Sequence, residues 1–199
     1  KELFPNHTYQ KSNLILQALR GVKDPEEIAH IQQACNITEK GFRRILRYVK
    51  PGVWEHEIEA EFAHEFLRNR SKGFAYTPII ASGANSNVLH YIENCRECKE
   101  GDMLLLDVGA EYGNYSSDMT RTIPVSGRFT PRQRAVYDAV LNVKNEATKL
   151  LVPGTLWKEY HKEVGKLMSS ALVDLKLLTK NEVSKNAEAY KKYFMHGTS

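Results

Sequence analysis

The 199-residue sequence has only three cysteines and no long hydrophobic run. Three cysteines cannot form a closed disulfide framework, so a reducing compartment such as the cytoplasm is expected. The longest aliphatic run, from Met103 to Leu106, is far shorter than a membrane span. The sequence therefore predicts a protein with no membrane partner.

The sequence also has little excess charge of either sign. Lys and Arg together number 28 and Asp and Glu 24, which gives a net charge of +4. The lysines are densest between residues 176 and 192, where they alternate with Glu and Asn, as is typical of a solvated helical face. We therefore expect no nucleic-acid partner. The hydrophobic fraction of 42% is that of an ordinary globular chain.

Helical periodicity and helix breakers predict two pairs of helices. Asp24-Pro25 is a strong helix start, and Pro51-Gly52 ends the pattern before a second helix that runs to about Gly73. Thr130-Pro131 opens a third helix, which ends at Pro153-Gly154, and residues 156–173 form a fourth. Residues 181–193 are expected to form a further helix or a lysine-rich connection, and residues 193–195 to begin a strand.

The region between the two pairs of helices has the pattern of strands. Strands are expected over residues 76–81, 88–92, 103–112 and 115–125, with a turn near Gly113-Asn114. The two Pro-Gly pairs stand 102 residues apart, and each separates two helices. This repetition predicts two similar α+β halves, of which the second stops where its strands should begin.

Asp107 and Asp118 are the main candidates for chemistry, because both fall on the strands of one expected hairpin. If the turn is at Tyr112-Gly113, paired residue numbers sum to 225 and the two aspartates are directly opposed. If the turn is at Gly113-Asn114, the sum is 227 and Asp118 is opposite Gly109, still on the face of Asp107. Opposed side chains lie about 4.5–5.5 Å apart at Cβ.

Two carboxylates at such a distance repel one another. A divalent cation or a shared proton between them would relieve the repulsion. The alternative is that Asp107 and Asp118 bind backbone groups or Arg121. His90, which follows an Asn-rich loop, and His196, near the end of the chain, are less informative on their own.

Five segments resemble the aminopeptidase P and prolidase family of metallopeptidases. They are Tyr76-Thr77-Pro78-Ile79-Ile80-Ala81-Ser82-Gly83 with Leu89-His90-Tyr91, Asp107-Val108-Gly109-Ala110-Glu111-Tyr112, Tyr115-Ser116-Ser117-Asp118-Met119-Thr120-Arg121-Thr122, and Phe194-Met195-His196-Gly197-Thr198-Ser199. The resemblance extends from about Gly21 to the end of the chain. Within the family, the sequence is most similar to the Xaa-Pro aminopeptidases.

This resemblance implies an α+β pita-bread fold, built from two pseudo-symmetric halves. The chain would contain the first half and the start of the second. Residues 1–23 would be the tail of a preceding N-terminal domain and its linker, and residues 24–199 an incomplete catalytic domain. The chain alone is expected to be inactive.

The resemblance also implies a site with two divalent metal ions, commonly manganese, with zinc or cobalt as alternatives. Asp107 and Asp118 match the two aspartate ligands, and Asp118 matches the one that bridges the metals. One histidine and two glutamate ligands would follow Ser199. His90 and His196 match active-site histidines that are not ligands, and Tyr76 matches a tyrosine that hydrogen-bonds a ligand carboxylate.

The function implied is hydrolysis of an N-terminal Xaa-Pro peptide bond by a metal-activated water. The substrate would be a peptide with proline in second position, and the full-length protein would be a cytoplasmic homodimer. Two alternatives remain open. One is a catalytically dead, peptidase-like module that binds proteins, and the other is a prolidase that acts on Xaa-Pro dipeptides.

Overall fold

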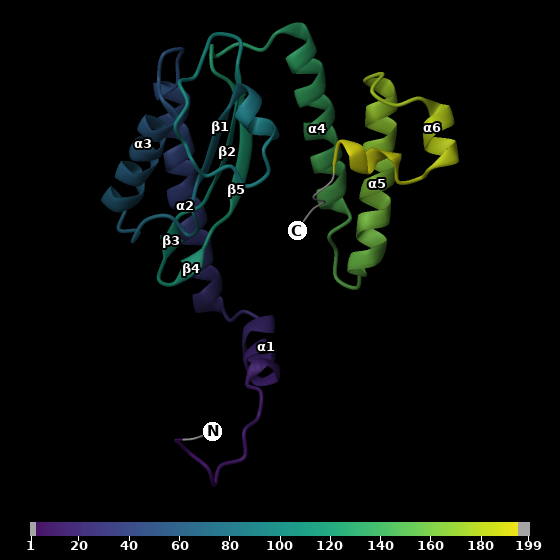
Figure 1. Ribbon diagram of the computed structural model, residues 1–199. Coiled ribbons are helices and arrows are strands. Elements are labelled where there is room, and N and C mark those ends of the chain that lie inside the picture. The colour runs from purple at the N-terminus through teal and green to yellow at the C-terminus, as the bar shows by residue number, and fades with distance from the viewer. Residues whose placement is uncertain (1–2, 195–199) are drawn as a thin grey trace. The chain divides into compact units, whose positions relative to one another are not determined.

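The computed structural model describes residues 3–194, which belong to two compact units, Lys1–Arg128 and Phe129–Ser199. Among the described residues, the strands all lie in the first unit, together with helices α1 to α3 (Figure 1). The second unit consists of helices α4 to α6 and a short 3-10 helix, η2. The mixture of helices and sheet agrees with the α+β class expected from the sequence.

The long helices of the first unit begin where local sequence signals place them. α2 (Pro25–Tyr48) has Asp24 as its N-cap, and the Asp24 carboxylate accepts a hydrogen bond from the Glu27 N–H at 2.9 Å. Glu27 returns a bond to the Asp24 N–H, which completes a capping box. Gly52 adopts φ +93° between α2 and α3 (Glu55–Arg68) and turns the chain back.

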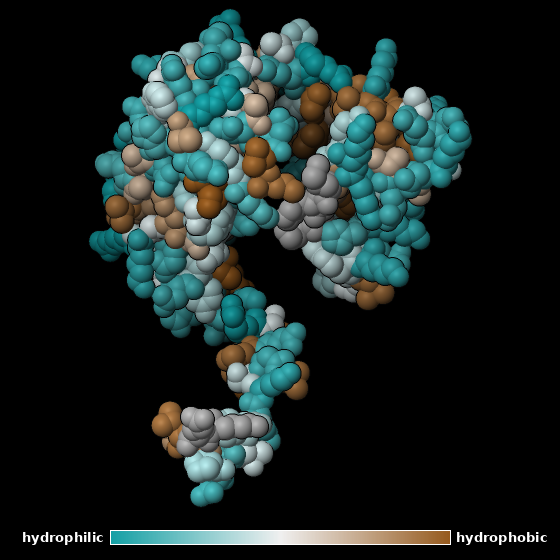
Figure 2. All heavy atoms as spheres, viewed as in Figure 1, coloured by the Kyte–Doolittle hydropathy of each residue, from teal (hydrophilic) through white to brown (hydrophobic). Residues whose placement is uncertain are grey.

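One helix was not predicted from the sequence. α1 (Asn13–Gly21) lies in the segment that was expected to be the tail of a preceding domain and its linker, and it is preceded by Ser12 without a side-chain capping bond. Its apolar residues Leu14, Ile15, Leu16 and Leu19 are all exposed, and apolar side chains are visible on this helix in Figure 2. No helix within residues 3–194 combines the length and apolar character needed to cross a membrane.

The main sheet has three antiparallel strands in the order β1-β2-β5, so β2 is central. β1 covers Ile79–Ser82, β2 Met103–Val108 and β5 Met119–Pro124. The hairpin continues as the short pair β3 (Glu111–Tyr112) and β4 (Tyr115–Ser116). Asp107 pairs with Thr120 and Tyr112 with Tyr115, so the turn is at Gly113-Asn114, the second of the two predicted registers.

The two faces of the sheet have different partners. Leu104, Leu106 and Val108 of β2 are fully buried in the main core with residues of α2 and α3, which lie along one face of the sheet (Figure 1). Leu105 points to the opposite face and packs in a smaller cluster with Ile79, Ala81 and Tyr91. Because side chains alternate along a strand, Asp107 lies on the face of Leu105, away from the helices.

One strand prediction was wrong in its bounds, and another was wrong altogether. The first strand begins at Ile79 rather than Tyr76, and residues 88–92 form no strand. η1 (Gly83–Asn87) follows β1 directly, and the chain continues in irregular structure to β2. His90 (φ +54°) and Asn94 (φ +44°) have left-handed backbones, which interrupt any extended pairing.

The second unit repeats the arrangement of a helix, a Pro-Gly pair and a helix. α4 (Pro131–Lys149) and α5 (Trp157–Asp174) flank Gly154, whose φ of +91° is close to that of Gly52. The segment expected as one helix or connection forms α6 (Lys180–Lys185) and η2 (Ala189–Lys192). Tyr193 and Phe194 are not in a strand, and the rest of the strand predicted there lies outside the described residues.

Candidate metal centre

Asp107 and Asp118, here called the carboxylate pair, are brought together by a tyrosine hydroxyl. The Tyr76 Oη lies 2.7 Å from Oδ1 of Asp107 and 3.1 Å from Oδ1 of Asp118. Asp107 is half-buried at the end of the central strand β2, whereas Asp118 is exposed just before β5. The structure therefore places three of the residues singled out from the sequence in one cluster.

A break in the hairpin lets the carboxylate pair converge. Between the two pieces of the hairpin, the chain approaches itself so closely that a Cβ on Gly109 would lie 1.8 Å from the carbonyl oxygen of Ser117. The Ala75 N–H donates to the Gly109 carbonyl at 2.8 Å, which places the next residue, Tyr76, against the same break. Glycine at this position is thus a steric requirement of the site.

Helix α2 braces this break through buried hydroxyl groups. The Thr38 and Ser117 side-chain oxygens are 2.6 Å apart, and both accept a hydrogen bond from the Ala110 N–H, at 2.8 and 2.9 Å. The Thr38 side chain is fully buried and Ser117 is almost so. Because Ser117 precedes Asp118, this network fixes the backbone from which one of the two carboxylates projects.

The carboxylate pair has no Lys or Arg partner within the part of the chain that the structure describes. Arg121, the expected alternative partner, donates to the carbonyl of Thr120 instead. Burial raises the pKa of the Tyr76 hydroxyl well above its usual value, and the hydrogen bond to Asp107 raises it further. Tyr76 therefore stays protonated at neutral pH, and it can donate only one hydrogen to the two acceptors.

These features fit one part of a metal site. Carboxylate oxygens are the ligands that hard divalent cations prefer, and a cation would relieve the repulsion within the pair. Within residues 3–194, however, no group of three or more His, Cys, Asp and Glu side chains could hold a metal ion. The carboxylate pair thus supplies two ligands, and a complete site needs more.

Of the two candidate histidines, His90 lies within the described residues. His90 is exposed and lies between β1 and β2, in the segment of residues 83–96 that we call the histidine loop. Tyr91, the next residue, packs against Ile79 and Ala81 on the same sheet face as Asp107. His196 lies outside the described residues.

We predict that Tyr76→Phe weakens metal binding by about 10–100-fold, as is common when a hydrogen-bond partner of a ligand is removed. The hydroxyl lies within hydrogen-bond distance of both carboxylates and can donate to either, and phenylalanine keeps the ring while removing that donor. Isothermal titration of Mn²⁺ into the metal-free full-length protein measures the effect. Tyr115→Phe is a matched control, because it removes a 2.8 Å bond to Glu27 Oε1 away from the pair. Equal affinities for Tyr76→Phe and the wild type would contradict the prediction.

The sequence did not reveal the residues that support the site. Thr38 and Ser117 appear as ordinary polar residues, and their pairing spans 79 positions in the chain. Glu55 is fully buried although it is a carboxylate in the first turn of a helix, where acids are usually solvated. The only available signals were its place at the start of α3 and the need for buried polar groups to find partners.

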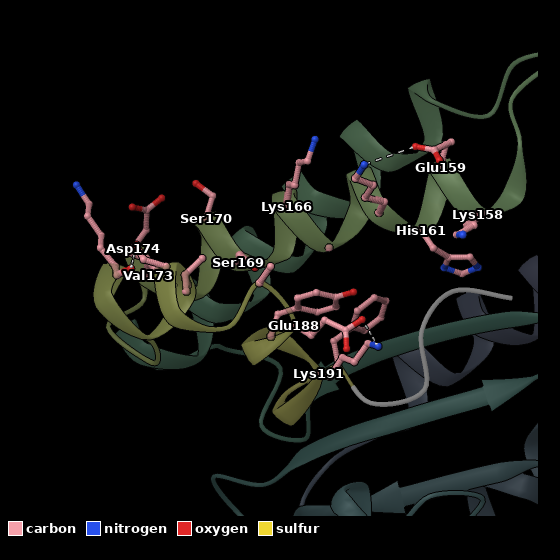
Figure 3. Close-up of a pocket in the computed structure, with 18 residues that line it drawn as sticks. Lys158, Glu159, His161, Lys166, Ser169, Ser170, Val173, Asp174, Glu188 and Lys191 are labelled. Carbon is pink, nitrogen blue, oxygen red and sulfur yellow. Dashed lines mark hydrogen bonds and ion pairs between the residues drawn. The ribbon is translucent and has the colours of Figure 1, made fainter.

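A hollow in the second unit lacks the features of a hydrolytic site. It measures about 1380 Å³ and lies between α5 and the segment formed by α6 and η2 (Figure 3). Two of its lysines pair with glutamates three residues away, Lys162 with Glu159 at 4.0 Å and Lys191 with Glu188 at 2.6 Å. Lys166 and Ser169 also line it from α5 (Figure 3). The carboxylate pair in the first unit is therefore the better candidate.

Most of this chain matches one family of proteins, by a family model and by individual relatives. The model of metallopeptidase family M24 matches residues 29–199. An Xaa-Pro aminopeptidase of Haemophilus influenzae is 40% identical over 185 residues, which cover 92% of this chain and 43% of that protein. The human Xaa-Pro aminopeptidase 3 is 38% identical over 183 residues, which cover 92% of this chain and 36% of that protein.

Solved structures agree with the sequence comparison. Zinc-substituted aminopeptidase P of E. coli, in complex with product, has a TM-score of 0.88 and 39% sequence identity. The alignment covers 94% of this chain and 43% of that one, so the chain spans less than half the length of the relatives it matches. The pita-bread fold expected from the sequence is confirmed for the matched part. By sequence and by fold, the chain belongs to metallopeptidase family M24.

Proposed function

We propose that the full-length protein is a metal-dependent exopeptidase that hydrolyses the peptide bond between an N-terminal residue and a following proline. The observation that carries this proposal is the carboxylate pair joined by the Tyr76 hydroxyl, in a chain of the M24 family. The names of its relatives support proline as the second residue of the substrate.

Asp107 and Asp118 would hold the metal ions, which we propose to be two manganese ions. When bound, such ions supply an activated water and a Lewis acid for the peptide carbonyl. Tyr76 would donate its hydroxyl hydrogen to one carboxylate of the pair, with the shorter contact to Asp107. One histidine and two glutamates beyond Ser199 would complete the ligand set, as the family resemblance implies. Two ligands make a weak site, so we expect the 199-residue chain alone to be inactive.

His90 would contribute a hydrogen-bond donor. An imidazole N–H aimed at the peptide oxygen stabilises the negative charge that develops there during attack by water. His196 would lie near the same centre, by resemblance to the family motif. The homodimeric state of the full-length protein stays a prediction, as does its cytoplasmic location, which was expected from the low cysteine content.

A peptide assay on the full-length protein tests this function. We expect Mn²⁺-dependent release of the first residue from an Xaa-Pro-Yaa tripeptide, and no release from Xaa-Ala-Yaa. Cleavage of only the Xaa-Pro dipeptide would indicate a prolidase. Absence of all cleavage by the folded, metal-supplied protein would contradict the proposal and favour the protein-binding module.

A further inference from the structure

Glu55 is a buried carboxylate that accepts hydrogen bonds on both of its oxygens. Oε1 accepts from the N–H and the O–H of Ser82, both at 2.7 Å. Oε2 accepts from the Tyr91 O–H at 2.7 Å and from the Arg96 N–H at 2.9 Å. The Glu55 side chain has no exposed surface, so these protein donors replace the water that a carboxylate normally binds.

The protein satisfies the Glu55 carboxylate from several directions. Four donor groups lie within 2.9 Å of its two oxygens, and a buried polar group with its partners in place is held firmly. Glu55 is also the first residue of α3, so these bonds attach to the start of that helix. Its own N–H donates to the Arg96 carbonyl at 2.9 Å, so both backbone and side chain bind the same residue.

The donors to Glu55 stand at both ends of the histidine loop. Ser82 ends β1 directly before the loop, and Tyr91 and Arg96 lie in its second half. The Tyr91 hydroxyl also accepts from the Cys95 N–H at 3.3 Å, which ties the turn after His90 to the same point. These bonds close the loop onto the start of α3.

This arrangement fixes the residue next to His90. Tyr91 directly follows His90, whose φ of +54° requires a backbone conformation that non-glycine residues seldom adopt. The Tyr91 ring is buried against Ile79, which pairs with Asp107 in the adjacent strand. The hydrogen bond from Tyr91 to Glu55 therefore sets the position of the His90 backbone relative to the strand that carries Asp107.

We propose that Glu55 is a positioning residue, which anchors the histidine loop through Tyr91 and so fixes His90 beside the sheet face that carries Asp107. The proposal rests on the proposed function, in which His90 donates a hydrogen bond to the reacting carbonyl. Glu55 itself does not contact the substrate.

A double-mutant cycle in the full-length enzyme tests this proposal. Tyr91→Phe keeps the buried ring but removes the hydroxyl, and we expect kcat for an Xaa-Pro-Yaa tripeptide to fall about tenfold with KM within about twofold. In a His90→Ala background, Tyr91→Phe should lower kcat by less than about twofold, because its effect acts through His90. Equal falls in both backgrounds would overturn the proposal.

Tyr115→Phe is the matched control, since it removes a tyrosine-to-glutamate bond of similar length far from the histidine loop. We expect it to leave kcat and KM unchanged in both backgrounds. A tenfold fall in kcat for this variant as well would show that losing any such bond impairs the enzyme, and would overturn the proposal.

Hydrogen exchange gives a readout that does not need activity. Glu55→Gln directs an amide NH₂ at donors that previously had an acceptor, so amides of residues 83–96 should exchange at least about tenfold faster. Amides of β2 and β5 should keep their rates. Unchanged exchange in the histidine loop would overturn the proposal. If Glu55→Gln does not fold, Tyr91→Phe serves for the same measurement. A wild-type enzyme that cleaves no peptide would instead refute the proposed function, while the exchange result would still decide the role of Glu55 as an anchor.

Discussion

Asp118→Asn in the full-length protein is expected to lower kcat/KM for an Xaa-Pro-Yaa tripeptide by at least about a thousandfold. A loss of that size corresponds to about 4 kcal/mol of transition-state stabilisation, which is the scale of metal-ion catalysis. Asparagine preserves the shape of the side chain but removes its charge and one of its two acceptor oxygens. The Tyr76 hydroxyl would then have Asp107 as its only carboxylate partner.

Asp138→Asn is the matched control for this substitution. Asp138 forms a 2.7 Å ion pair with Arg134 on the surface of α4. The substitution therefore makes the same chemical change in a carboxylate that is not part of the carboxylate pair. Surface pairs of this kind contribute little to stability, and we expect kcat/KM to stay within about twofold of wild type. An Asp118→Asn enzyme with wild-type kcat/KM would contradict the assignment of the carboxylate pair.

Gly109→Ala is expected to cause the largest loss of stability among the substitutions considered, about 3 kcal/mol in the free energy of unfolding. The added Cβ would lie 1.8 Å from the Ser117 carbonyl oxygen and 3.1 Å from the Tyr76 ring. The first contact is with backbone, which cannot move aside as a side chain can. Relief requires the two strands of the hairpin to separate at the point where the carboxylate pair converges.

Chemical denaturation of the full-length protein, followed by circular dichroism, measures this effect. Gly21→Ala is the control, because a Cβ there would meet no atom within 4 Å, and its effect should stay within about 0.5 kcal/mol. Equal denaturation midpoints for Gly109→Ala and wild type would show that the hairpin can relax at the break.

The helices were predictable because their signals are local. Asp24, Pro25 and Glu27 form the cap of α2 within a single turn, and each has its partner three residues away or fewer. α1 was not predicted because its start lacks a side-chain cap. Its apolar residues Leu14, Ile15, Leu16 and Leu19 stay exposed, so burial in a core does not explain this helix.

The register of the hairpin could not be predicted from the alternation of strand residues alone. Both possible turns place Asp107 and Asp118 on one face, so the pattern could not choose between them. The structure has Gly113 at φ +60° and Asn114 at φ +67°, the two left-handed residues of a type I′ hairpin turn. Asparagine tolerates this conformation better than the tyrosine that the other register would require.

Part of the histidine loop, residues 88–92, was wrongly predicted to be a strand because its conformation depends on a distant residue. Residues 88–92 have apolar and aromatic side chains that favour a strand, but the Tyr91 hydroxyl binds Glu55, which is 36 positions earlier in the chain. A buried carboxylate with several donors overrides the local preference. The sequence therefore predicted that Asp107 and Asp118 lie together, but it did not predict the conformation of the histidine loop.

Titration of Mn²⁺ into the metal-free full-length protein tests the assignment of the carboxylate pair most directly. The wild type should bind two ions per chain. The double variant Asp107→Asn/Asp118→Asn should bind neither tightly, while its circular dichroism spectrum stays that of the folded protein. A folded double variant that still binds two ions with wild-type affinity would contradict the assignment of Asp107 and Asp118 as metal ligands.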